Sequence, residues 1–153
     1  MQPVTTRHAT IPDLNTLLAF EQGIINAERP FDPTLVDGQI YYYDLPEMIE
    51  NPNVAVIVAQ SGEQVIGVGT ARIIKAQVFY KYAEFAHIRF MYVAPDFRGQ
   101  GINAMLMDAL KAWCISRDVK ELRLSVYTDN EPAINAYKKA GFSDILTEMR
   151  LPL

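Results

Sequence analysis

Apolar and polar positions recur along the chain with the spacings typical of alternating strands and helices. Runs of alternating or β-branched residues predict strands at residues 4–8, 54–60, 64–74, 79–93 and 121–127, and a last one carrying Ile145, Thr147, Met149 and Leu151. Helical spacing predicts helices over residues 14–25, 45–50, 101–117 and 131–140. The resulting order, β-α-(α)-β-β-β-α-β-α-β, predicts an α/β fold in which helices cover the faces of a mixed sheet.

Length and composition are those of an ordinary globular domain. The 153 residues predict one domain, residues 1–153, and half of them are apolar. A net charge of -4 disfavours a nucleic-acid surface, which needs clustered positive charge. The N-terminal residues lack the apolar core of a signal peptide, and the aliphatic run at residues 54–59 is too short to span a bilayer. We therefore expect a cytoplasmic protein without membrane contact.

A glycine-bearing loop at residues 98–103 connects a predicted strand to a predicted helix. Glycine lets the backbone approach a ligand closely, and the free N–H groups of the first helical turn attract an anion. The loop therefore favours a phosphate-bearing ligand, with a simple tight turn as the alternative. The phosphate loop of nucleotide-hydrolysing enzymes, Gly-x-x-x-x-Gly-Lys-Ser/Thr, is absent from the sequence, and no His/Cys cluster has the spacing of metal ligands. The single cysteine, Cys114, is predicted to pack in the core.

Two motifs in the C-terminal half carry a family resemblance. Residues 98–103 match the pattern Arg/Gln-x-x-Gly-x-Gly/Ala, except that Asn103 stands where Gly or Ala is usual. The pattern Asn-x-x-Ala-x-x-x-Tyr-x-x-x-Gly-Phe is matched at every fixed place, by Asn130, Ala133, Tyr137, Gly141 and Phe142. Together they resemble the GNAT superfamily of acetyl-coenzyme-A-dependent N-acetyltransferases. The resemblance implies a single domain with a central, mostly antiparallel sheet and helices on both faces.

The resemblance also implies a reaction and a set of residues for it. Acetyl-coenzyme A (acetyl-CoA) would donate its acetyl group to a primary amine by direct attack, and Tyr137 would act as the general acid toward the thiolate. The alternative for Tyr137 is an aromatic residue of the core. Asn130 would cap its helix, bind the cofactor arm, or both. The residues implied to bind acetyl-CoA are Met91, Tyr92, Val93, Arg98, Gly99, Gln100, Gly101, Ile102, Asn103 and Asn130.

The general base has two candidates on one predicted strand. Some family members carry a Glu eleven residues before the phosphate loop, and His87 occupies that position here. Imidazole titrates near neutral pH, so His87 could accept the proton of the amine directly or through water. Strict alternation places His87, Arg89, Met91 and Val93 on one face and Glu84 on the other, unless a β-bulge intervenes. A structural histidine, with water as the base, is the alternative.

The segment from residue 21 to residue 50 is expected to shape the acceptor site. It is acidic, with Glu21, Glu28, Asp32, Asp37, Asp44, Glu47 and Glu50 against Arg29 alone. Its aromatic residues are Phe31, Tyr41, Tyr42 and Tyr43. An acidic and aromatic surface would attract a cationic small-molecule or peptide amine by steering and cation–π contact. The alternative is a solvated acidic surface with the tyrosines packed beneath it.

A second class of function stays open beside the enzyme. The same fold could serve as a non-catalytic acyl-CoA-binding sensor or interaction module, which Asn103 favours and Tyr137 opposes. The sequence leaves a homodimer open.

Overall fold

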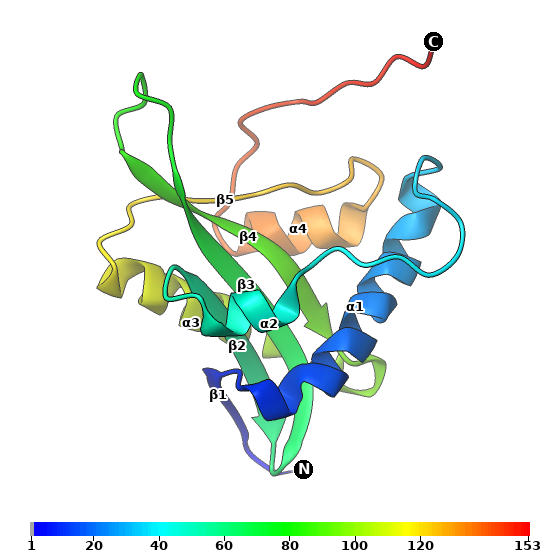
Figure 1. Ribbon diagram of the computed structural model, residues 1–153, viewed down its shortest axis with the longest axis vertical. Coiled ribbons are helices and arrows are strands. Elements are labelled where there is room, and N and C mark those ends of the chain that lie inside the picture. The colour runs from blue at the N-terminus through cyan, green and yellow to red at the C-terminus, as the bar shows by residue number, and fades with distance from the viewer. Residues whose placement is uncertain (1) are drawn as a thin grey trace.

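A five-stranded sheet in the order β1-β2-β3-β4-β5 forms the middle layer of the molecule (Figure 1). The computed structural model describes residues 2–153, so Met1, the first residue of the expected domain, lies outside it. Neighbouring strands are antiparallel from β1 to β4, and β5 runs parallel to β4. The strands are β1 (Val4–His8), β2 (Val54–Ser61), β3 (Gln64–Lys75), β4 (Glu84–Val93) and β5 (Leu122–Leu124).

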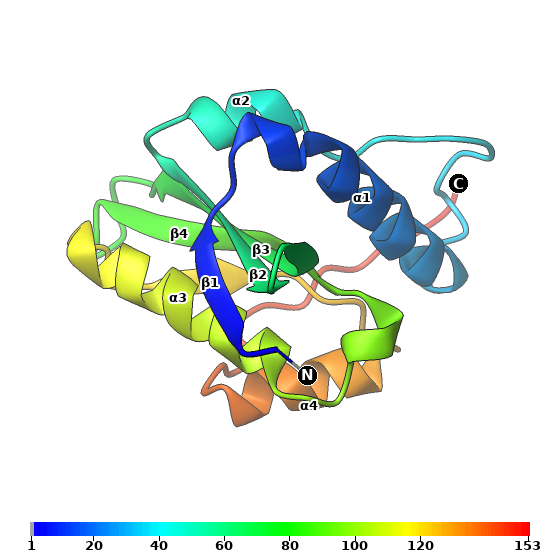
Figure 2. The same ribbon diagram turned by 90° about the horizontal axis from the view of Figure 1, so that it is seen from below.

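Helices cover both faces of this sheet, as Figure 2 shows from below. One face carries α1 (Leu14–Glu28) and α2 (Leu45–Glu50), and the other carries α3 (Ile102–Ser116) and α4 (Glu131–Lys139). Short 3-10 turns at Ile11–Asp13 (η1), Arg29–Phe31 (η2) and Pro95–Phe97 (η3) complete the chain. The arrangement confirms the predicted α/β class. Within residues 2–153, none of the helices combines the length and apolar character that a membrane span requires.

Strand β2 explains why the sheet is covered on both sides. Its residues 54–59 are all buried, which is typical of a strand packed on both faces and shows in the sequence as an unbroken apolar run. Ala55, Ile57 and Ala59 pack toward α3, in a core that includes the free thiol of Cys114. Val56 lies in the second core, under α1 and α2. The two cores therefore meet at the central strands.

Strand β4 contains a β-bulge that changes the faces of its side chains. Thr70 of β3 lies opposite two residues of β4, Arg89 and Phe90, because the register moves from Gly69 with Met91 to residue 71 with residue 88. The N–H of Phe90 donates to the buried Thr70 hydroxyl at 3.1 Å. The buried Phe90 N–H is therefore hydrogen-bonded even though the bulge interrupts the ladder.

The bulge makes the predicted alternation along this strand wrong. Met91 and Val93 pack in the core against α3. His87 precedes the bulge and Arg89 is its first residue, so both lie on the face of α1 and α2 rather than beside Met91 and Val93. Glu84 lies on the opposite face from His87, as expected, because no bulge separates the two.

Three predicted strands differ from the structure. The strand expected to begin at residue 79 begins at Glu84, because the preceding residues form the β3–β4 connection, where the Tyr80 N–H bonds to the Gln77 carbonyl. The strand expected over residues 121–127 ends at Leu124. The last expected strand does not form: residues 143–153 have no regular structure, and Ile145 is exposed. Its alternating pattern finds no strand edge with which to share a hydrogen-bonded ladder.

An ion pair fixes the start of α1 against β1. The guanidinium of Arg7 donates to both carboxylate oxygens of Asp13, at 2.8 and 2.9 Å, and the Thr10 N–H donates to the same carboxylate at 2.8 Å. The hydrogen bond from Arg7 is the main reason that the pKa of Asp13 falls to about 2. Because the pKa is lower in the folded chain than in the unfolded one, the pair stabilises the fold above pH ~4 and loses this effect toward pH ~2.

We expect Asp13→Asn to lower the free energy of unfolding by about 1–2 kcal/mol at neutral pH, a value discounted for the partial exposure of Arg7. Urea unfolding at several pH values measures this, and the gap from the wild type should narrow as the pH falls from ~5 toward ~2. Asp37→Asn, at an exposed loop position, is the matched control. A gap that is independent of pH would contradict the ionic explanation.

Candidate functional site

Strands β4 and β5 pair only briefly and then diverge. Their parallel ladder joins residues 86–88 to residues 122–124, after which β5 ends. Strand β4 continues for Arg89 to Val93, and within the described chain no strand pairs with it on that side. The free N–H and C=O groups of this edge can bind an extended ligand arm in the manner of an added strand. Met91, Tyr92 and Val93, predicted to bind the cofactor arm, lie on this edge.

The glycine loop follows directly from the open end of β4. Arg98 is tied back to the strand, because its Nε donates to the Val93 carbonyl at 2.9 Å and its guanidinium lies over the Tyr92 ring at 5.4 Å. Gly99 and Gly101 have φ values of 73° and 79°, which side chains other than glycine rarely adopt. A Cβ placed on either glycine would meet no atom within 4 Å. The loop therefore offers open space beside exposed backbone, as a phosphate group requires.

The first turn of α3 presents unpaired N–H groups to this space. Gly101 is its N-cap, and no side chain caps the helix. By contrast, the side chains of Asp44 and Asn130 cap α2 and α4, each of which also has an acidic residue in its first turn. The first turn of α3 has no acidic residue. Its N–H groups and positive dipole end are thus left for an anion.

Asn103 lies in this first turn and is partly buried. Its neighbour Ile102 is 2% exposed and anchors the start of α3 in the core. The position where the family pattern expects Gly or Ala therefore holds an amide side chain next to the unpaired N–H groups. The amide NH2 of Asn103 is therefore an additional hydrogen-bond donor at the helix start.

The second motif shapes both ends of α4. The side chain of Asn130 caps the N-terminus by accepting from the Ala133 N–H at 3.4 Å. At the other end Gly141 has a φ of 104°, its N–H bonds to the Lys138 carbonyl, and the Phe142 N–H bonds to the Tyr137 carbonyl, both at 3.0 Å. This is a Schellman cap. The capping role expected for Asn130 is therefore present.

The Schellman cap also fixes the ring of Tyr137. Phe142 packs edge-on against it with ring centroids 5.9 Å apart, the apolar contact that accompanies this cap. Tyr137 also packs against the α3 core. Burial, and next the charge of Glu28, raise the pKa of Tyr137 above its usual value of about 10. Its hydroxyl therefore keeps its proton at neutral pH.

The predicted acceptor residues have different environments. Tyr41 is exposed, while Tyr43 stacks on the core residue Phe90 at 4.9 Å, and burial raises its pKa. The N–H groups of Tyr42 and Tyr43 both donate to one oxygen of the buried Glu21 carboxylate at 2.8 Å. Tyr43 thus packs against the core, whereas Tyr41 and Tyr42 lie at the surface of the segment.

Phe31 leads to a cluster that the sequence did not indicate. Its ring stacks on Tyr127 with centroids 6.0 Å apart, and the Tyr127 hydroxyl donates to Asp32 at 3.0 Å. Arg150 donates to both oxygens of Asp32 at 2.9 and 3.3 Å, which is the main reason that the pKa of this carboxyl is lowered. Burial first, and then Asp32, raise the pKa of Tyr127 to about 12. Separations of 95 and 118 residues hid these contacts from the sequence pattern.

The two candidate bases lie along β4 away from the glycine loop. Glu84 is exposed at the first residue of the strand, nine residues before Val93. His87 pairs with Arg72 of β3 and Arg123 of β5 across the sheet. Burial, and next the charge of Arg89, lower the pKa of His87, so its imidazole is neutral at pH 7. The structure does not bring Glu84 to the glycine loop.

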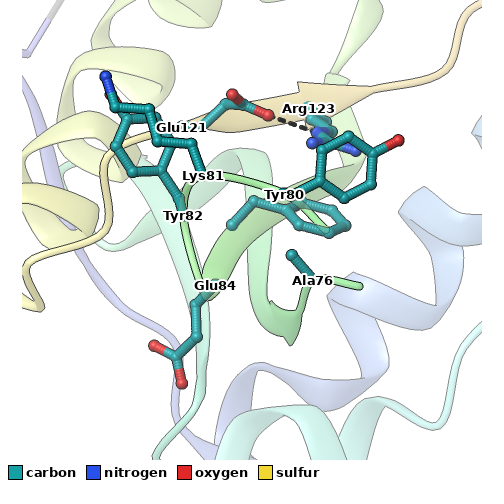
Figure 3. Close-up of a pocket in the computed structure, with 8 residues that line it drawn as sticks. Ala76, Tyr80, Lys81, Tyr82, Glu84, Glu121 and Arg123 are labelled. Carbon is teal, nitrogen blue, oxygen red and sulfur yellow. Dashed lines mark hydrogen bonds and ion pairs between the residues drawn. The ribbon is translucent and has the colours of Figure 1, made fainter. Parts of the chain in front are cut away.

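A pocket of about 210 Å³ lies at this far end of the sheet (Figure 3). Glu84 lines it, together with residues of the β3–β4 connection. Arg123 is already engaged there, because it bonds to Glu121 and lies against the rings of Tyr80 and Phe85 at 5.0 and 4.3 Å. The pocket is thus separate from the glycine loop, and the Arg123 side chain that lines it is already paired with Glu121. Within residues 2–153 no group of three or more His, Cys, Asp and Glu residues could hold a metal ion.

Comparison with known families decides the relationship. The model of the acetyltransferase (GNAT) family matches residues 22–142, which include both motifs. The chain belongs to this family. The streptothricin acetyltransferase of Escherichia coli is 33% identical over 69 residues, which are 45% of this chain and 40% of that protein. The thialysine N-epsilon-acetyltransferase of Mus musculus is 33% identical over 55 residues, 36% of this chain and 32% of that protein. The chain thus spans less than half of either relative.

Solved structures share the GNAT fold over nearly the whole chain. A tetramutant of the BH1408 protein of Bacillus halodurans has a TM-score of 0.87 at 18% identity, covering 97% of this chain and 99% of that one. A predicted acetyltransferase of Clostridium acetobutylicum, solved with acetyl-CoA, has a TM-score of 0.76 at 21% identity, covering 98% and 96%. An aminoglycoside 6'-N-acetyltransferase of Acinetobacter haemolyticus has a TM-score of 0.74 at 15% identity, covering 97% of each chain. At these identities the likeness establishes the fold.

We expect Gly101→Ala to weaken acetyl-CoA binding about tenfold or more, because a strained or displaced loop loses a backbone bond to a charged phosphate. Gly38→Ala is the matched control: Gly38 also has a positive φ, 86°, and open space around it, but lies in the loop between η2 and α2. Both variants carry similar backbone strain of ~1–2 kcal/mol. Calorimetric titration with acetyl-CoA measures the difference, and equal affinities of the two variants would contradict the assignment of the loop.

Proposed function

We propose that the protein transfers the acetyl group of acetyl-CoA to a primary amine. The observation that carries this proposal is the open edge of β4, which leads directly into the left-handed glycines at the uncapped start of α3. The arrangement suits a ligand with an extended amide arm that ends in a pyrophosphate. Membership of the GNAT family and the Clostridium acetobutylicum neighbour solved with acetyl-CoA support the same ligand.

Each part of the site has a role in this proposal. The backbone of Met91 to Val93 holds the arm, and the loop and first helical turn hold the pyrophosphate through Arg98, Gly99, Gln100, Gly101, Ile102 and Asn103. Acetyl-CoA supplies an activated thioester, whose carbonyl carbon an amine can attack and whose sulfur is a good leaving group. A backbone N–H of the open β4 edge donates to the thioester oxygen and so favours negative charge there.

Tyr137 is the proposed general acid. Burial keeps its hydroxyl protonated, and the contact with Phe142 holds its ring in one place. A phenol can protonate a thiolate, whose conjugate acid has a pKa of ~8.5 in an ordinary thiol. Tyr137 therefore holds the proton that the leaving sulfur needs, while the alternative, a purely structural ring, requires no hydroxyl.

The proposed acceptor is a cationic amine. The acidic segment that contributes Glu28, Asp32 and Tyr42 lies at the end of α1, with Tyr127 beside it. Aromatic rings and negative charge together favour ammonium groups. The relatives support this class, because one is named for streptothricin and another for thialysine, and a neighbour is an aminoglycoside acetyltransferase.

We expect Tyr137→Phe to lower kcat by ~100-fold or more, the usual contribution of a positioned acid. The affinity for acetyl-CoA and the thermal stability should stay close to those of the wild type, because the ring and its contact with Phe142 remain. Tyr82→Phe, on the β3–β4 connection, is the matched control. Steady-state release of the CoA thiol measures the rates, and an unchanged kcat would remove Tyr137 from the mechanism.

We expect cadaverine to be a better acceptor than aminocaproate, with kcat/KM at least about tenfold higher. The two molecules share a primary amine on a similar chain, but the second end carries an ammonium in one and a carboxylate in the other. The advantage should shrink as salt is raised. A preference for aminocaproate would contradict the cationic class. Binding of acetyl-CoA without transfer to any amine would instead favour the acyl-CoA sensor, the function that Asn103 would suit.

A further inference from the structure

The C-terminal segment, residues 143–153, has few polar contacts with the rest of the molecule. All of its residues are exposed, and they have no regular structure. Within residues 2–153 its side chains form two ion pairs. Asp144 pairs with Lys138 of the adjacent α4 at 3.4 Å, and Arg150 pairs with Asp32, 118 residues away in the sequence. Arg150 therefore holds the end of the segment against the end of α1 (Figure 2).

The carboxylate of Asp32 is held in place by neutral groups as well as by Arg150. Only 9% of its side chain is exposed. Thr34 donates to Oδ1 through its N–H at 3.0 Å and its hydroxyl at 2.6 Å, and the Tyr127 hydroxyl donates to Oδ2 at 3.0 Å. These donors fix the carboxylate without neutralising its charge. A carboxylate that is largely removed from water is unfavourable unless a cation accompanies it.

Arg150 supplies this cation in a geometry that suits a planar guanidinium group. One nitrogen donates to Oδ1 of Asp32 at 2.9 Å, and the second donates to Oδ2 at 3.3 Å. The stacked rings of Phe31 and Tyr127 accompany the carboxylate, and aromatic rings favour cations. The side chain of Arg150 is 56% exposed, so a dissolved cation can reach the same carboxylate.

The ion pair between Arg150 and Asp32 is open to competition. Pairs in which one partner is largely exposed contribute little stability. The effective concentration of a group on a short flexible tether is in the millimolar range, so a ligand at similar concentration can displace it. Glu21 differs, because it is 0% exposed. Its Oε1 has no hydrogen-bond partner within residues 2–153, but a cation from solution cannot reach this atom in the folded chain.

Asp32 and its neighbours also contact the segment that leads to the proposed acid. Tyr127 follows the end of β5, beyond the point where β5 separates from β4. Its carbonyl accepts the N–H of Asn130, the N-cap of α4, at 3.0 Å. Tyr137 lies about two turns farther along this helix. A cation bound at Asp32 is therefore next to the N-terminal end of the helix that carries the proposed acid.

We propose that Asp32, Tyr127 and Phe31 bind a guanidinium or ammonium group of the acceptor, and that Arg150 occupies this site until the acceptor replaces it. The inference rests on the proposed function and narrows the acceptor to a primary amine with a second positive group. The exchange keeps the charge balanced, because one cation leaves the carboxylate as another arrives. The C-terminal segment is then an internal competitor of the acceptor.

The test uses agmatine, which has a primary amine at one end and a guanidinium at the other. Pentylamine, whose single cation is the reacting amine, is the comparison for rates. The variants are Arg150→Gln, Asp32→Asn and the two combined, with Lys139→Gln, at an exposed position of α4, as the matched control. Calorimetry gives the affinity of the CoA-bound protein for agmatine. Release of the CoA thiol gives kcat/KM for both amines.

We expect Arg150→Gln to bind agmatine about fivefold more tightly than the wild type, because the site is no longer partly occupied. Asp32→Asn should weaken agmatine binding about tenfold or more and should cancel the gain when combined with Arg150→Gln. The kcat/KM for agmatine should follow these affinities. The kcat/KM for pentylamine and the affinity for acetyl-CoA should stay within twofold, and Lys139→Gln should match the wild type.

The direction of the Arg150→Gln effect decides the inference. An unchanged or weaker affinity for agmatine would show that Arg150 is a structural contact and not a competitor, and this result does not depend on how well Asp32→Asn folds. Asp32→Asn with undiminished agmatine binding, or with an equal loss for pentylamine, would also overturn the inference. The proposed function fails by a separate result, the absence of acetyl transfer to any amine, because the calorimetric affinities are measured without turnover.

Discussion

The early separation of β5 from β4 is the constraint on which the candidate site depends. Three paired residues hold the two strands together, and beyond them β4 keeps a free backbone edge. A free edge normally invites pairing with another chain. Here it leads into a loop whose two left-handed glycines and uncapped helix start favour an anion. A longer β5 would pair with this edge of β4. An extended ligand arm could then no longer bind beside the glycine loop.

The bulge in β4 changes which face of the sheet its side chains occupy. Beyond it, Met91 and Val93 pack toward α3, the core that also holds the ring of Tyr137. Arg89, the first residue of the bulge, lies on the α1 face, where its charge acts on Glu28. An unbroken strand would place Arg89 and Met91 on the same face. Because of the bulge, Met91 and Val93 pack in the core that Tyr137 also contacts, while the positive charge of Arg89 lies on the other face, near Glu28.

The sequence predicted those features that arise from local rules. The buried run at residues 54–59, the cap at Asn130 and the helix end at Gly141 depend on near neighbours, and all are present. The bulge depends on the pairing of β4 with Thr70, and the Asp32 cluster depends on Arg150, 118 residues away. The alternation at residues 145–151 resembles a strand, but a strand also needs a partner that no local pattern supplies.

The count of acidic residues in the acceptor segment overstates the field that an incoming amine meets. Two backbone N–H groups donate to one oxygen of the buried Glu21, and its other oxygen has no hydrogen-bond partner within residues 2–153. A bidentate guanidinium neutralises Asp32, so the charge of Asp32 is balanced within the fold. Arg150 supplies this countercharge from the otherwise exposed C-terminal segment, which approaches the end of α1 (Figure 2). The charge presented to a ligand thus depends on where the last residues of the chain lie. Because short-range charges dominate in salt, an incoming ammonium responds more to the carboxylates close to it than to the summed charge of the segment.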